Sequence, residues 1–175
     1  MMMKNEGKFA AKVIDHDLEM DNNGNLKSVH VRFSVIDVDG SEKEITSFMS
    51  LKGPQPGKTT SALEITLKNL VLLGFKGTKD ADILALARGI PGSEELKPLA
   101  LDGEKVVELV LENEEYQGKK RLRVKYINEP GRGGMKRMEG SAAVVNLGGL
   151  NIAGHLAAAR AEAGVPAVAA KKTPF

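Results

Sequence analysis

The stretch KVVELVLENEEYQGKKRLRVKYINE, residues 105–129, decides the fold that this sequence predicts. Apolar and charged residues alternate on both sides of Gln117-Gly118, which is typical of two antiparallel strands joined by a short turn. Because side chains alternate along a strand, the second strand should present one apolar face and one cationic stripe. We expect the apolar face to hold Leu122, Val124 and Tyr126, and the stripe to hold Arg121, Arg123 and Lys125. Such a stripe suits a phosphate backbone, although solvated strand faces also carry Lys and Arg without any ligand.

Three further strands precede this hairpin. Alternation predicts them over residues 7–19, 26–38 and 42–51, with turn signals at residues 21–25 and at Asp39-Gly40. The side chains expected in the core are those of Phe9, Ala11, Val13, Val29, Val31, Phe33, Val35, Ile45, Met49 and Leu51. On the third strand, this choice leaves Phe48 on the outer face.

A break and two helices separate the third strand from the hairpin. GPQPG at residues 53–57 ends the strand, because proline lacks the donor that a ladder needs. One helix is predicted from a cap within residues 59–61 through residue 73, closed by Gly74, and a shorter one over residues 80–88. This order predicts a mainly β fold, a five-stranded OB-like barrel with a helical insert between strands 3 and 4 and a C-terminal extension. An open five-stranded α+β sheet is the alternative.

Composition and charge bound the class of protein. Of 175 residues, 42% are hydrophobic and 27% charged, which is ordinary for a globular chain. The absence of Cys excludes disulfides, thiolate metal sites and cysteine nucleophiles, and fits a reducing cytoplasm. No run approaches the roughly 18 apolar residues that a membrane span needs. We therefore expect no membrane association and a location in the cytoplasm.

Two regions differ in charge. Residues 1–130, the predicted nucleic-acid-binding domain, carry 19 Lys/Arg against 21 Asp/Glu, a balance of −2. Residues 131–175, a Gly/Ala-rich basic tail, carry 6 against 2, a balance of +4. Within the tail, residues 152–163 predict a short helix that would be marginal on its own. Any attraction to an anion must therefore come from local patches and from the tail.

The motifs that suggest catalysis or metal binding are weak. GPQPGKTT at residues 53–60 resembles a phosphate-binding loop, but only three residues lie between its glycines, where that loop has four, and two of the three are prolines. A series of acidic residues at one strand end could bind a divalent cation or simply be a solvated strand edge, and we favour the solvated edge. The histidines share no spacing typical of a metal site or a nucleophile. The acidic series consists of Asp15, Asp17, Glu19 and Asp21, and the histidines are His16, His30 and His155. We expect no enzymatic activity, no catalytic residue, no cofactor and no metal.

The outer face of the predicted sheet is the stronger signal. Binding a single strand requires a positive groove for the backbone and ring faces on which bases stack. We expect Phe48 and Tyr116 to be exposed, whereas Phe9, Phe33 and Tyr126 should be buried. The candidate nucleic-acid-binding residues are Arg32, Phe48, Lys52, Lys58, Tyr116, Lys119, Lys120, Arg121, Arg123 and Lys125.

Four segments carry a family resemblance: GKFAAKVIDHDLEM, LKSVHVRFSVIDVDG, LKNLVLLGF and ENEEYQGKKRLRVKYI, within residues 7–129. In these segments the chain resembles phage-encoded single-stranded-DNA-binding proteins with an OB-fold. The resemblance implies non-catalytic protection of single-stranded DNA in phage replication or recombination, in the cytoplasm of a bacterial host cell, with protein partners recruited through the tail. Members often end in an acidic tail with a terminal aromatic residue, whereas here Lys171 and Lys172 precede Pro174-Phe175. The tail is therefore expected to add phosphate contacts through Arg132, Lys136 and Arg137.

The leading hypothesis is therefore a binder of single-stranded nucleic acid. This hypothesis is compatible with a homo-oligomer. The alternatives are a protein–protein interaction or structural module that docks through its tail, and a nucleotide-binding enzyme that uses residues 53–60.

Overall fold

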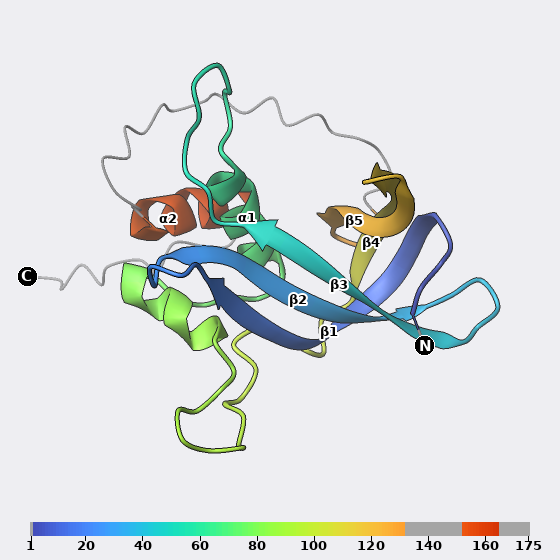
Figure 1. Ribbon diagram of the computed structural model, residues 1–175, viewed down its shortest axis with the longest axis horizontal. Helices are drawn as coiled ribbons and strands as arrows, with labels where there is room; N and C mark the ends of the chain where they lie inside the picture. The colour runs from blue at the N-terminus through green and yellow to red at the C-terminus, as the bar shows by residue number, and fades with distance from the viewer. Residues whose placement is uncertain (1, 132–151, 165–175) are drawn as a thin grey trace, which may run out of the picture.

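The computed structural model describes residues 2–131 and 152–164. Within them, five antiparallel strands form one sheet in the order β3-β2-β1-β4-β5 (Figure 1). The strands are β1 Gly7–Met20, β2 Leu26–Ile36, β3 Glu42–Ser50, β4 Val107–Tyr116 and β5 Lys119–Asn128. The expectation of a mainly β chain with five strands is confirmed.

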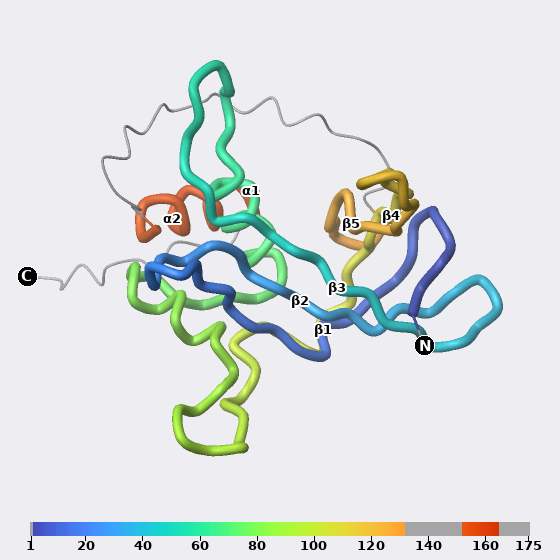
Figure 2. Tube along the Cα trace, viewed as in Figure 1, coloured from blue at the N-terminus to red at the C-terminus, as the bar shows by residue number. Residues whose placement is uncertain are grey.

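Strand β1 lies at the centre of the sheet and bends between its two partners. Its residues 7–11 pair with β4, and its residues 11–20 pair with β2. The edge strands β3 and β5 approach one another across the far side of the core. The open sheet is therefore coiled into a barrel-like shape, from which residues 51–61 and 87–106 project on opposite sides (Figure 2).

The core lies inside this coil. The expected inward residues of the first three strands are all buried, which confirms the predicted alternation there. Val107, Leu109 and Leu111 of β4 and Ile127 of β5 complete the strand contribution.

A β-bulge in β1 brings a histidine into this core. The register with β2 skips Ile14, so the inward phase changes after Val13 and the His16 side chain is only 2% exposed. His16 Nε2 accepts a hydrogen bond from Ala100 N at 2.8 Å, so Nδ1 carries the proton and donates to Leu86 O at 2.8 Å. The ring therefore joins β1 to two segments of the connection between α1 and β4.

A second β-bulge lies in β5. The register with β4 passes from Tyr126 to Val124, so Lys125 is the extra residue. Tyr126 consequently faces outward and is 48% exposed, while Ile127 turns into the core. The prediction that Tyr126 is buried beside Leu122 and Val124 is therefore wrong.

The turn of the β4–β5 hairpin is the predicted one. Gln117 has φ 53° and Gly118 has φ 73°, and a two-residue hairpin turn of type I′ needs positive φ at both positions. This turn pairs Tyr116 with Lys119 and fixes the register of the residues that follow.

Helix α1, Ala62–Leu72, follows β3, and the 3₁₀ helix η1, Asp80–Leu86, precedes β4. Ser61 caps α1, because its hydroxyl accepts from Glu64 N while the Glu64 carboxylate accepts from Ser61 N. Gly74 follows the helix with φ 89°, and a Cβ there would lie 2.6 Å from that of Asp102. Only glycine combines this φ with so close an approach.

Helix α2, Ile152–Glu162, packs against α1 (Figure 1). Ile152, Leu156 and Ala159 join the core, so the predicted tail helix forms with a partner that supplies its burial. Arg160 donates to the carbonyl oxygens of Phe75 and Gly77, beyond the end of α1. In the parts of the chain that are described, no helix is long and apolar enough to cross a membrane.

Candidate nucleic-acid interface

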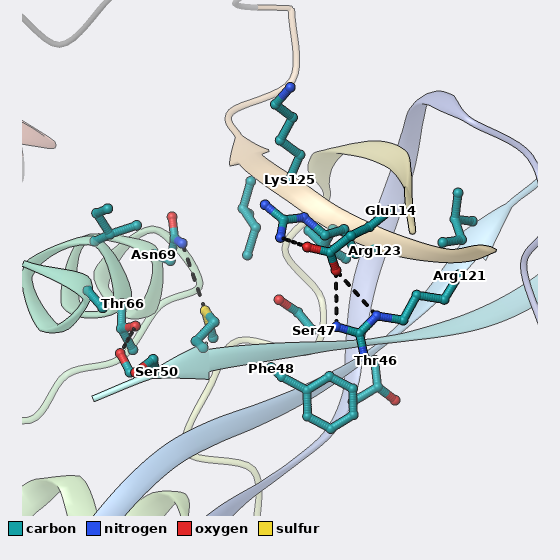
Figure 3. Close-up of a pocket in the computed structure, with 16 residues that line it drawn as sticks. Thr46, Ser47, Phe48, Ser50, Thr66, Asn69, Glu114, Arg121, Arg123 and Lys125 are labelled. Carbon is teal, nitrogen blue, oxygen red and sulfur yellow. Dashed lines mark hydrogen bonds and ion pairs between the residues drawn. The ribbon is translucent and has the colours of Figure 1, made fainter. Parts of the chain in front are cut away.

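A groove of about 370 Å³ lies where the edge strands approach one another (Figure 3). Phe48 of β3 and Ile65 and Asn69 of α1 line one side. The other side comes from β5 and includes Arg121, Arg123 and Lys125. The groove thus combines exposed apolar groups with a row of cations.

Phe48 is the most exposed ring at this groove. Alternation along β3 turns it away from the buried Ser47 and Met49, and 70% of the residue is exposed. The ring meets His30 of β2 edge-on, with centroids 4.6 Å apart and planes 72° apart. The predicted exposure of Phe48 is confirmed, and an open aromatic face is what a stacked base requires.

The cationic stripe of β5 is paired with carboxylates of β4. Arg121 Nη2 lies 3.0 Å from Glu114 Oε2, and Arg123 Nη1 lies 2.6 Å from Glu114 Oε1 (Figure 3). Lys125 Nζ lies 2.6 Å from Glu112 Oε2. The hydrogen bond from Arg121 and the nearby charge of Arg123 lower the pKa of Glu114, and the bond to Glu112 raises the pKa of Lys125. These ion pairs therefore partly neutralise the electric fields of the three cations.

Tyr116 lies at the tip of the hairpin beside these residues. It is 53% exposed, and the Arg121 guanidinium covers its ring at 4.5 Å from the centroid. The predicted exposure of Tyr116 is thus confirmed, although it does not line the groove. Arg121 therefore links the Glu114 carboxylate to an aromatic ring.

Arg32 projects from the outer face of β2, outside the groove lining. It pairs with Asp15 at 2.6 Å and with Glu44 at 3.8 Å. Although burial opposes it, the hydrogen bond from Arg32 lowers the pKa of Asp15. Arg88 also lies 3.5 Å from Asp15. Arg32 is therefore part of an ion-pair cluster beside the groove.

The remaining predicted contacts are dispersed. Lys52 and Lys58 lie on the projecting connection before α1, and Lys119 and Lys120 lie at the hairpin tip. All four are exposed, and none lines the groove. The N-terminus of α1 already bonds its own cap and the Lys52 carbonyl oxygen, which accepts from Leu63 N at 3.0 Å. These bonds occupy N–H groups at the start of α1 that a phosphate would need, and the two prolines within residues 53–60 donate none.

The acidic strand end is engaged in pairs and turns. Glu19 accepts hydrogen bonds from Lys27, Ser28 and His30. These bonds, above all the one from Lys27, lower the pKa of Glu19 to about 2. Asp21 accepts from backbone N–H groups of the first hairpin turn. Among residues 2–131 and 152–164, no three His, Asp or Glu side chains gather as metal ligands.

The sequence interpretation missed two kinds of residue at this site. Glu112 and Glu114, which pair with the cations, could have been predicted, because a two-residue turn at Gln117-Gly118 places them opposite Arg123 and Arg121. Ile65 and Asn69 could not, because their position depends on how α1 packs against the sheet.

Comparison with known proteins identifies no relative: no protein-family model matches the chain, and no curated protein matches it.

Proposed function

We propose that this protein binds single-stranded DNA, without catalysis, in the groove between β3, α1 and β5. The observation that carries the proposal is a single groove that is lined both by the exposed Phe48 ring and by three cations of β5. A stacking platform beside a phosphate-binding row is the combination that sequence-tolerant recognition of a single strand requires.

The topology supports an OB-type barrel as the scaffold. In that fold, five strands form a partly open barrel, and oligonucleotides bind on the face of strands 2 and 3 and on nearby loops. Here the sheet order is β3-β2-β1-β4-β5 with its edge strands close together. Phe48 lies on β3 and its partner His30 lies on β2, so the aromatic pair occupies the corresponding face.

The ion pairs of the stripe are compatible with this role. Arg121 and Arg123 keep about half of their side-chain surface exposed, so solvent and salt weaken their attraction to Glu114. A strand of DNA offers several phosphates at once, and its charge density exceeds that of one carboxylate. Phosphates are therefore able to compete for the guanidinium groups.

The biological setting follows from the family resemblance. We propose protection of single-stranded DNA in phage replication or recombination, with the tail as the contact for replication or recombination proteins. The expected phosphate contacts at Arg132, Lys136 and Arg137, and the tip at Pro174-Phe175, lie outside the described residues.

Fluorescence anisotropy with labelled oligo-dT tests the proposal, with the full chain titrated at low and at physiological salt. We expect micromolar or tighter affinity for the single strand, a clear preference over duplex of equal length, and weaker binding as salt rises. Absence of binding to oligo-dT at low salt would refute the proposal. Equal affinity for duplex would indicate a general polyanion surface instead of a stacking groove.

A further inference from the structure

The Glu114 carboxylate lies between the two guanidinium groups of the groove (Figure 3). Its Oε2 accepts from Arg121 Nη2 at 3.0 Å and from Arg121 Nε at 3.3 Å, and its Oε1 accepts from Arg123 Nη1 at 2.6 Å. One carboxylate thus receives three charge-assisted hydrogen bonds from two arginines that are spaced two residues apart on one strand face.

The backbone holds both partners in place. The hairpin register sets Glu114 directly opposite Arg121, and Arg123 lies on the same side of β5. The Arg121 guanidinium is further held over the Tyr116 ring. The arginine pair is therefore an organised oxyanion site that an internal carboxylate fills.

A phosphodiester can replace this carboxylate with little rearrangement of the arginines. Both groups carry one negative charge over two free oxygens, and guanidinium forks bind either one. Glu114 itself retains about a third of its side-chain exposure, so a rotamer change moves its carboxylate into solvent.

We propose that Glu114 fills, in the free protein, the position that a backbone phosphate of a bound single strand takes, and that binding exchanges one anion for the other. This inference rests on the proposed function. Because the exchange replaces one ion pair by another, the phosphate alone gains little net free energy. Stacking of a base on Phe48 must supply the rest, so a phosphate ligand without bases should bind this site weakly.

Two measurable consequences follow. Removing the Glu114 charge should tighten binding of oligo-dT by about two- to fivefold, the scale of one exposed ion pair. It should also steepen the dependence of log K on log salt by up to about 0.7, because one more phosphate is then neutralised without releasing an internal anion. A base-free polyanion should gain by a similar factor, since any phosphate that takes this position displaces the same carboxylate.

The experiment compares Glu114→Gln with Glu115→Gln. Gln is isosteric with Glu, and Glu115 is the exposed neighbour on the opposite side of β4, opposite Lys120. Both variants change the net charge equally. Oligo-dT affinity is measured over a salt series, and inorganic polyphosphate is measured as a competitor.

We expect Glu114→Gln to bind oligo-dT more tightly with a steeper salt slope, and to bind polyphosphate with a similar gain, whereas Glu115→Gln shows smaller changes and an unaltered slope. Equal effects of the two variants, or no gain for Glu114→Gln, would overturn the inference while the wild-type chain still binds. Failure of the wild-type chain to bind oligo-dT would instead overturn the proposed function.

Discussion

Replacing Phe48 by Ala separates the proposed binding role from stability. The ring is 70% exposed, so its removal leaves no cavity in the core. In the folded protein it loses the edge contact with His30, and aromatic pairs of this kind contribute about 0.5–1.5 kcal/mol. The free energy of unfolding should therefore change little against a typical total of about 5–15 kcal/mol.

The effect of Phe48→Ala on binding should be larger. A stacked base contributes about 1–3 kcal/mol, which corresponds to a roughly five- to 150-fold increase in Kd. Phe48→Tyr, which keeps an aromatic face, should restore most of the affinity. Anisotropy with oligo-dT measures the first quantity, and urea denaturation of the same samples measures stability.

Tyr126→Ala is the matched control for Phe48→Ala. Tyr126 is also aromatic and is 48% exposed, but the bulge at Lys125 turns it away from the groove. We expect this variant to bind oligo-dT nearly as the wild type does. If Phe48→Ala retains wild-type affinity, or if Tyr126→Ala loses as much, the assignment of the groove as the stacking site is wrong.

Three further changes test the electrostatics and the fold. Lys125→Ala should reduce the steepness of log K against log salt by up to about 0.7, whereas Lys76→Ala, on the connection after α1, should leave it unchanged; equal changes would contradict a local site. Burial lowers the pKa of His16 from its ordinary value of 6.5, so the unfolded chain binds the proton first. The contribution of His16 to stability is complete above that value and declines as the pH falls towards the folded-state pKa. His16→Gln should flatten this decline in the free energy of unfolding, measured by urea titrations between about pH 7 and pH 5. An unchanged pH profile would show that the decline does not come from His16. Leu156→Ala should destabilise the protein by about 2–5 kcal/mol, compared with a small change for the exposed Leu96→Ala, and a negligible effect would show that α2 is not docked in solution.

Much of the sheet could be predicted from the sequence because apolar side chains alternate over long stretches of its first three strands. Phe9, Ala11 and Val13 of β1 and four residues of β2 from Val29 to Val35 stand at every second position, and all of them are buried. The hairpin was readable for a second reason. A two-residue turn at Gln117-Gly118 sets the register without any knowledge of the tertiary structure.

The β-bulges at Ile14 and Lys125 were not predicted, and each reverses the faces of the residues that follow it. Both lie beside a pair of consecutive apolar residues, Val13-Ile14 in β1 and Tyr126-Ile127 in β5. At such a pair, either residue can take the inward position, and the strand pattern alone does not decide which. Partner strands and core packing decide it, so the outward turn of Tyr126 required the structure.

The charge of the chain constrains how strongly salt should affect binding. Three free cations at the groove would give a slope of about −2 in log K against log salt for a single strand. Arg121, Arg123 and Lys125 instead begin in ion pairs with Glu114 and Glu112, and residues 1–130 as a whole carry a balance of −2. Displaced carboxylates take up cations from solution, so the slope from the groove should be shallower than that value. Stacking then carries a larger share of the affinity than the number of basic residues suggests, and binding through this groove should persist at salt concentrations that remove duplex binding.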